Sequence, residues 1–177
     1  MTAPHLDVSS IPEWAHSPVA LNEYAIDRSG RSYVLVGVGP DTESAVRRWS
    51  HELDGKGVLE VLAPDVEQAG RRLAAVIDAA RVGLRVLVTG PTSACLALRG
   101  VAVNAGLEDD EVSVCPTGAG SLTVFCAHCR AVTEATAGIG DTAECVGCER
   151  QLLIYHHVSR RSGQFLGFMV DAEEAAC

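Results

Sequence analysis

The stretch "CAHCRAVTEATAGIGDTAECVGC", from Cys126 to Cys148, holds four of the seven cysteines of the chain. They form two Cys-x-x-Cys pairs separated by fifteen residues, a spacing typical of structural zinc sites. Each pair aims two thiolates at one point, and two pairs complete a tetrahedron. Four unrelated thiols would not be paired in this way, and a redox disulfide in one pair would leave the second pair unexplained. The predicted metal ligands are Cys126, Cys129, Cys145 and Cys148.

Zinc is the metal we expect, because it is the usual occupant of a closed site of four cysteines. An iron–thiolate centre is the alternative, since tetrahedral sulfur coordination also suits iron. Four protein ligands leave no open coordination position for a substrate or a water molecule. The site is therefore expected to be structural or electron-transferring, and we assign no catalytic residue to it.

The residues around the cysteine pairs predict a small β module over residues 121–177. "SLTVFC" leads into the first pair, and residues 151–170 read as two strands joined by the turn "SRRSG". Two cysteine turns with a three-stranded antiparallel sheet describe a zinc ribbon whose metal is held by four cysteines. A module of about fifty residues has too small a hydrophobic core to fold without an additional crosslink, and a bound metal provides such a crosslink.

Residues 31–120 show short apolar runs that alternate with helical patterns, which is typical of parallel βαβ units. We therefore predict an α/β domain with a small doubly wound parallel sheet, preceded by an irregular arm over residues 1–30. The expected strands are Ser32–Gly39, Gly57–Ala63, Leu84–Gly90 and Glu111–Gly118, and the expected helices lie in Asp41–Leu53, Pro64–Gly83 and Pro91–Gly106.

Two turns between a strand and a helix are candidates for nucleotide binding, because phosphates dock on free N–H groups at such places. "GVGPDT" is an incomplete dinucleotide fingerprint, since Thr42 stands at the third glycine position. Asp41 would repel a pyrophosphate, and we favour helix capping as its role. The second turn, "TGPTS", offers Thr92 and Ser93 as caps. The candidate cofactor-binding residues are Gly37, Gly39, Thr42, Thr89, Gly90, Pro91 and Thr92.

Histidines and the remaining cysteines are weaker candidates. His128 lies inside the first cysteine pair, but the four cysteines already complete the ligand set. His156 and His157 are adjacent on a predicted strand and therefore point to opposite faces. Cys95 and Cys115 are expected to behave as small buried apolar residues.

The charge of the chain limits the classes of partner. The formal net charge is −9, with ten Lys/Arg against sixteen Asp/Glu up to Gly120 and four against seven after it. Both parts would repel a phosphate backbone or an anionic membrane, so a zinc-ribbon nucleic-acid adaptor is the least favoured function. No apolar run is long enough to span a bilayer, and the first residues do not read as a secretory signal. Together with the cysteine usage, this predicts a cytoplasmic protein.

The α/β part resembles the nicotinamide-nucleotide half of ferredoxin reductases in "YVLVGVGPDTES" and "LRVLVTGPTSACLALRGVAVNAGLEDDEVSV". The Gly-Pro of Gly90 and Pro91 is kept, while Thr89 stands where those enzymes often have cysteine. No flavin-binding barrel precedes this part, so we do not expect an intact reductase. The resemblance implies contacts to NAD(P)H.

The C-terminal part resembles the DmmA-like small subunit of bacterial dimethylamine monooxygenase. The likeness rests on the two cysteine pairs, the His-x-Ser of His157 to Ser159, the strand Phe165 to Phe168, and the Asp-Ala-Glu of Asp171 to Glu173. It implies a multi-component, NAD(P)H-dependent oxygenase that demethylates dimethylamine to methylamine and formaldehyde. Flavin, haem and iron–sulfur groups would then belong to the partner subunits.

Two functions follow from these resemblances. In the first, the chain is an accessory subunit that docks on the electron-transfer and haem subunits and is not catalytic alone. In the second, it is a nucleotide-binding reductase component that contributes NAD(P)H contacts to a flavin on a partner.

Overall fold

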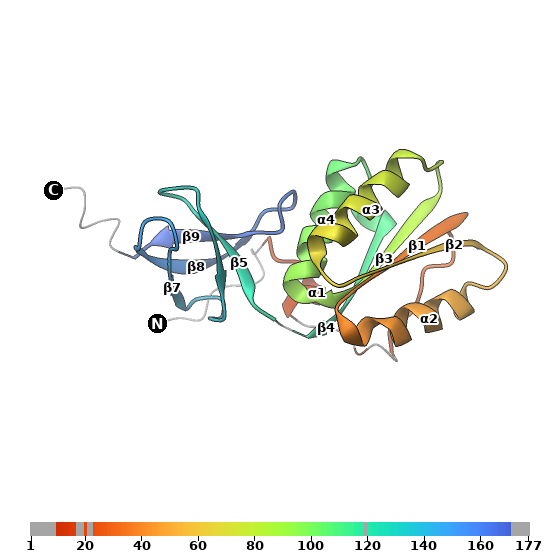
Figure 1. Cartoon of the computed structure of the whole chain (residues 1–177), viewed down its shortest axis with the longest axis horizontal. Coiled ribbons are helices and arrows are strands. Elements are labelled where there is room, and N and C mark those ends of the chain that lie inside the picture. The colour runs from red at the N-terminus through yellow and green to blue at the C-terminus, as the bar shows by residue number, and fades with distance from the viewer. Residues whose placement is uncertain (1–9, 17–19, 21–22, 119, 171–177) are drawn as a thin grey trace.

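The computed structural model describes residues 10–16, 20, 23–118 and 120–170, which form two sheets arranged along the long axis of the molecule (Figure 1). The first has four strands in the order β2-β1-β3-β4, and the second has five in the order β6-β5-β9-β8-β7. Asp171–Glu173 of the expected motif and Cys177 lie outside the described residues, as do 1–9, 17–19 and 21–22 of the expected arm. The domain boundaries after residues 30 and 120 stay predictions.

The strands and helices follow the predicted alternation closely. The strands are β1 Ser32–Val38, β2 Gly57–Ala63, β3 Leu84–Pro91, β4 Val112–Gly118, β5 Leu122–Cys126, β6 Val132–Ala135, β7 Thr142–Glu144, β8 Gln151–Val158 and β9 Phe165–Met169. The helices are α1 Glu13–His16, α2 Glu43–Glu52, α3 Val66–Asp78 and α4 Thr92–Asn104, with 3-10 turns η2 Pro40–Thr42 and η3 Asp109–Glu111. Within these described elements, no helix has both the length and the apolar character needed to cross a membrane.

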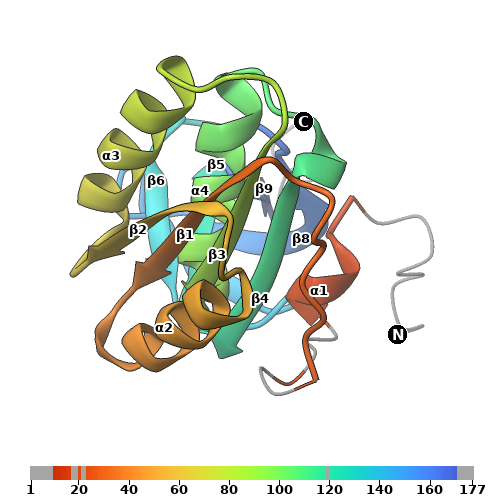
Figure 2. The same cartoon turned by 90° about the vertical axis from the view of Figure 1, so that its right-hand side faces the viewer.

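The four-stranded sheet is parallel and covered on both faces, as predicted (Figures 1 and 2). Successive side chains of a strand point to opposite faces, so β1 contributes to two cores. Val34 and Val36 pack in the core beneath α3 and α4, whereas Tyr33 and Leu35 pack in the core beneath α2. Burial on both faces explains why this strand is an uninterrupted apolar run.

Three helix boundaries differ from the prediction. α2 begins at Glu43 rather than Asp41, because Pro40–Thr42 forms a 3-10 turn and Asp41 does not cap the helix. α3 ends at Asp78, well before the predicted stop at Gly83. α4 begins at Thr92, whose hydroxyl donates to the Gly118 carbonyl at 2.9 Å instead of capping the helix.

Residues of the expected arm pack against the rest of the chain, and four of them form a helical turn. Trp14, in α1, contacts both the core beneath α3 and α4 and the core of the second sheet. Tyr24 lies against the fully buried Trp49 of α2, with 5.9 Å between the ring centroids.

The second sheet differs from the predicted three-stranded antiparallel ribbon. The hairpin of β8 and β9 is present, but β5 pairs with β9 in parallel, and β6 and β7 extend the two edges. β6 and β7 have four and three residues, too short for alternation to mark them in the sequence. They run beside β5 and β8, since each cysteine pair reverses the chain.

The tight turn between β8 and β9 joins the two sheets by lying against α4. A Cβ on Gly163 would lie 2.5 Å from the backbone carbon of Leu96, and one on Gly100 would lie 2.5 Å from the carbonyl oxygen of Arg161. Asn104 donates from its side-chain amide to the same carbonyl at 2.9 Å. The backbones therefore touch at positions where only glycine fits.

Charged groups surround this contact. Arg160 and Arg99 both bind Asp109, at 3.0 and 2.7 Å. Exposed pairs of this kind contribute about 0–1 kcal/mol each. Close packing at Gly100 and Gly163 therefore contributes more to the contact between the β8–β9 turn and α4 than these ion pairs do.

We predict that Gly100→Ala lowers the melting temperature, whereas Gly70→Ala in α3 leaves it unchanged or raises it. Alanine is favoured over glycine inside a helix by up to about 1 kcal/mol. At Gly70 the added methyl meets Val101 at 3.4 Å, but at Gly100 it meets backbone that cannot yield, at a cost of about 1–3 kcal/mol. Thermal unfolding of both variants checks this. Equal shifts of the two melting temperatures would contradict the close packing of Gly100 against the β8–β9 turn.

Candidate metal centre

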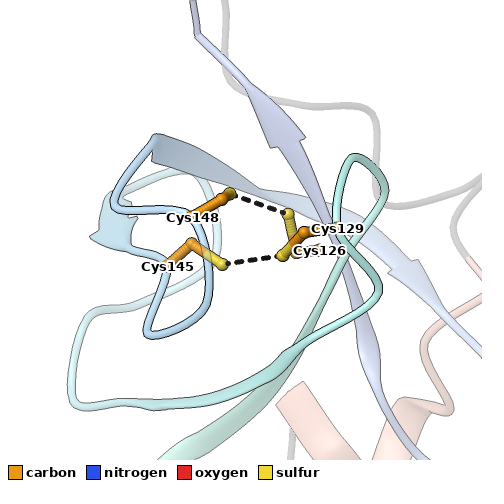
Figure 3. A group of neighbouring side chains, drawn as sticks. All are labelled: Cys126, Cys129, Cys145 and Cys148. Carbon is orange, nitrogen blue, oxygen red and sulfur yellow. Dashed lines mark hydrogen bonds between the residues drawn. The ribbon is translucent and has the colours of Figure 1, made fainter.

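The four predicted cysteine ligands converge at one end of the second sheet (Figure 3). Their sulfur atoms all lie within 4.8 Å of one another, with 3.8 Å between Cys126 and Cys148 and 3.5 Å between Cys129 and Cys145. A tetrahedral ion with bonds of about 2.3 Å to sulfur requires sulfur–sulfur distances of about 3.8 Å. The spacing of the sulfurs thus fits a tetrahedral ion without rearrangement of the backbone.

Each cysteine pair lies on its own backbone turn, called here a knuckle, and the two knuckles have the same pattern of hydrogen bonds. In each knuckle the first cysteine accepts a hydrogen bond on its carbonyl from the residue four positions later and donates its N–H to the residue five positions later. The donors to Cys126 and Cys145 are Arg130 and Glu149, and the acceptors are Ala131 and Arg150, all at 2.9 Å. The two halves of the site are thus built alike.

Arg130 and Glu149 hold the left-handed backbone conformation, with φ of 66° and 58°. They occupy equivalent places, one residue after the second cysteine of each knuckle. Among the described residues these are the two non-glycine positions with positive φ. A conformation that costs free energy for an L-residue persists where the surrounding structure fixes it, and here it turns the chain back into the sheet.

Gly147 closes the second knuckle around the sulfurs. Its N–H points at the sulfur of Cys145 at 3.4 Å, and a Cβ in its place would lie 2.6 Å from the Cβ of Ala131 and 3.2 Å from the sulfur of Cys129. The site therefore requires a residue without a side chain at this position. The equivalent position of the first knuckle is His128, which is exposed.

The four thiols do not ionise alike. Burial disfavours the thiolate of Cys145, but the N–H groups of Gly147 and Cys148 and the neighbouring thiols outweigh it and lower its pKa to about 6. The N–H of Arg150 favours the thiolate of Cys148, but desolvation and the other three cysteines outweigh it and raise that pKa to about 12. Four thiolates this close repel one another, so they coexist when a cation binds between them.

The donor set determines what the centre can do. Four sulfur ligands fill a tetrahedral shell, and no coordination position is left for a substrate. Cys126 and Cys145 are fully buried in the core of the second sheet, while Cys129 and Cys148 lie nearer the surface. With a metal bound, this arrangement would crosslink the strands that carry the cysteines and leave no thiol free to act on a substrate.

Two features of the centre escaped the sequence analysis. One is Gly147, for which the glycine inside the second Cys-x-x-Cys was an available signal. The other is Thr133 of β6, a buried residue whose hydroxyl accepts the N–H of Val146 at 3.2 Å and holds the second knuckle to the sheet edge. Its strand was too short to be recognised.

The predicted nucleotide-binding residues gather at the carboxyl end of the first sheet. The order β2-β1-β3-β4 places the topological switch point between β1 and β3, where Gly37 pairs with Thr89. Gly90 has a φ of +149°, and a Cβ there would lie 2.9 Å from the carbonyl oxygen of Val38. It is therefore needed for the close approach of the two strands.

Two of these seven residues, Gly39 and Thr42, line a hollow of about 440 Å³ next to the start of α2. The Thr42 hydroxyl donates to the Gly39 carbonyl at 2.9 Å, and the acidic Glu43 lines the same hollow. Thr89 is completely buried, and its hydroxyl has no hydrogen-bond partner within the described structure. Nucleotide binding at these residues stays a prediction.

The other candidates have ordinary positions. His156 is partly buried and His157 exposed, and the Nδ1 atom of His157 lies 3.1 Å from the hydroxyl of Ser10. Cys95 and Cys115 are buried in the cores of the α/β part, as expected, and burial raises the pKa of the Cys95 thiol.

We predict that Gly147→Ala weakens the affinity of the chain for metal at least tenfold in competition with a chelator, because its methyl displaces Ala131 and Cys129. A loss of this size corresponds to about 1.4 kcal/mol of binding free energy. His128→Ala at the equivalent position should bind metal like the unchanged chain. Elemental analysis after dialysis against the chelator measures both, and parity of the two variants would refute the assigned role of Gly147.

A comparison with protein families covers the residues of this site. Residues 123–168 match the family model of the dimethylamine monooxygenase subunit DmmA-like, C-terminal domain. The heme-dependent oxidative N-demethylase delta subunit of Ectopseudomonas mendocina (strain ymp) is 33% identical over 111 residues, which are 63% of this chain and 62% of that subunit. The chain thus matches less than two thirds of the length of this relative.

Among solved structures, phthalate dioxygenase reductase, described as a modular structure for electron transfer from pyridine nucleotides to a 2Fe-2S centre, aligns with a TM-score of 0.42 at 14% identity. The alignment covers 66% of this chain and 48% of that one. The family match includes both cysteine pairs and the β8–β9 hairpin. Residues 123–168 are therefore similar to the DmmA-like C-terminal domain, and the resemblance predicted from the cysteine pairs is confirmed.

Proposed function

We propose that this chain is an accessory subunit of a multi-component oxidative N-demethylase. The observation that carries the proposal is the closed four-cysteine centre inside the DmmA-like domain, together with the identity to an N-demethylase delta subunit. Such a centre stabilises a surface and performs no substrate chemistry. We therefore assign this chain no catalytic residue and place oxidation on other subunits.

Dimethylamine is the substrate that the resemblance favours. Its oxidative demethylation consumes one O2 and one NAD(P)H with a proton, and it yields methylamine, formaldehyde, water and NAD(P)+. Flavin, haem and iron–sulfur groups on partner subunits supply the electron transfer and the activation of oxygen. The chain described here docks on the electron-transfer and haem subunits of that assembly.

Zinc is the metal that we propose for the four cysteines, with iron as the alternative. Zinc favours four-coordinate tetrahedral thiolate sites, and the sulfur spacing suits such a site. Binding of structural zinc contributes on the order of 10 kcal/mol of apparent free energy, comparable with the whole stability of a domain. The ion would thus hold the knuckles together and with them the surface that the partners meet.

The proposal predicts that the chain, expressed with the other subunits of an oxidative N-demethylase, co-purifies with them and carries one zinc per chain. Size-exclusion chromatography with elemental analysis and a formaldehyde assay provides the readout. Omitting this chain should lower the formaldehyde formed from dimethylamine while leaving the haem content of the other subunits unchanged. A chain that elutes alone from its co-expressed partners would overturn the proposal.

The second candidate function is a nucleotide-binding reductase component that contributes NAD(P)H contacts to a flavin on a partner. The hollow beside Gly39 and Thr42 favours it, since it opens next to an N-terminal helix turn without a side-chain cap. Against it, Glu43 lines the hollow, and none of the described residues that line it is cationic. Calorimetry with NADH and NADPH decides, and the absence of heat at millimolar nucleotide would exclude this role.

A further inference from the structure

The second sheet carries apolar side chains on both of its faces. Its inner face packs in the core that includes Val124, Leu152 and Phe165. Strand register places a second apolar set on the opposite side, called here the outer face. This set consists of Phe125, Val132, Leu153, Leu166 and Phe168.

The outer face is exposed at Phe168 on the central strand β9 and at Val132 on the edge strand β6, although both side chains are apolar. Phe168 is 49% exposed and Val132 is 43% exposed, and both contrast with the fully buried side chains of the inner face. A sheet with one free face normally alternates apolar and polar residues, so that the free face is polar. An exposed apolar patch on a folded protein commonly marks a site of association.

Acidic residues border this face on both sides. Register places Glu134, opposite Thr123, on the edge strand β6, and it places Glu144, opposite Gln151, on the edge strand β7. These two are the charged residues that the described register assigns to the outer face. The edge strands are four strand spacings apart, and the register sets Glu134 level with position 164 and Glu144 level with position 170, so the two carboxylates lie at diagonally opposite corners of the apolar centre.

A hollow of about 300 Å³ opens beside the apolar centre. Phe125 and Leu166 line it together with the polar side chains of His157, Ser159 and Gln164. Its walls are apolar on the side of the sheet and polar on the side of the β8–β9 turn. The hollow thus suits one large amphipathic side chain from another protein, the usual anchor of an interface.

We propose that the outer face docks a partner protein whose surface has an apolar centre flanked on both sides by Lys or Arg residues. The inference rests on the proposed function, which supplies the partner as a subunit of the N-demethylase. Charge complementarity selects this occupant, because basic residues would pair with Glu134 and Glu144 while the apolar centres meet. Interfaces of this kind have an apolar core and a polar rim.

A second copy of this chain fits the outer face poorly. Two identical faces would bring acidic borders together, on chains that each carry a net charge of −9. Like charges placed opposite each other weaken association. The α/β part does not cover the outer face either, because it contacts the second sheet through the β8–β9 turn and the inner core.

The test compares the affinity of variants for the N-demethylase subunit that co-purifies with the unchanged full-length chain. Phe168→Ser removes the central apolar side chain, and Leu59→Ser is its matched control, since Leu59 is 47% exposed on β2 of the other sheet. Glu134→Lys with Glu144→Lys reverses the acidic border, and Asp54→Lys with Glu60→Lys reverses two exposed acids of the α/β part. Bound metal per chain verifies that the second sheet of every variant is folded, and thermal unfolding verifies the α/β part.

We expect Phe168→Ser and the Glu134/Glu144 double variant each to weaken binding roughly tenfold or more, with both controls unchanged. Salt should weaken binding of the unchanged chain but strengthen binding of the double variant, because it screens the repulsion between the introduced lysines and the basic residues of the partner. Wild-type affinity in both outer-face variants would overturn the inference alone. A wild-type chain that forms a dimer, which Phe168→Ser dissociates, would assign the face to a second copy and overturn it too. If no subunit co-purifies, the proposed function and the inference fail together.

Discussion

The convergence of four sulfur atoms between two knuckles is the constraint on which the second sheet depends. Cys126 and Cys145 are part of its small core, and the knuckles connect β5 to β6 and β7 to β8. A sheet of short strands buries too little apolar surface to offset its conformational entropy alone. A metal ion between the four sulfurs would connect the β5–β6 and β7–β8 strand pairs and compensate for the small core. The matching backbone hydrogen bonds of the two knuckles hold the cysteines in place for it.

The second sheet also packs closely against the α/β part. From the second knuckle, β8 runs to the turn that lies on α4, where Gly163 and Gly100 allow backbones to touch. Leu96 of α4 completes the core of the second sheet, and Trp14 contacts both cores. The outer face is therefore carried by a sheet that packs closely against the α/β part.

Strong local patterns predicted most of the fold. The alternation of β1, α2 and β2 could be predicted from hydrophobic periodicity, and the convergence of the paired cysteines could be predicted from their spacing. In both cases the residue pattern is typical of one local structure. β6 and β7 were missed because strands of three or four residues carry no pattern, and their pairing is decided by the knuckles. The parallel pairing of β5 with β9 is likewise determined by tertiary contacts and not by a local sequence pattern. The glycine inside the second Cys-x-x-Cys marks Gly147 in the sequence, but its close contacts with Ala131 and Cys129 and the composition of the outer face depend on residues distant in sequence.

Hydrogen exchange of the full chain before and after removal of the metal by a chelator tests the central claim most directly. If the four-cysteine centre holds the second sheet, amides of β5, β8 and β9 lose most of their protection, while those of β1 and β3 keep theirs. Restoring zinc should restore the protection. Unchanged protection of β5, β8 and β9 in the metal-free chain would contradict the structural role of the centre.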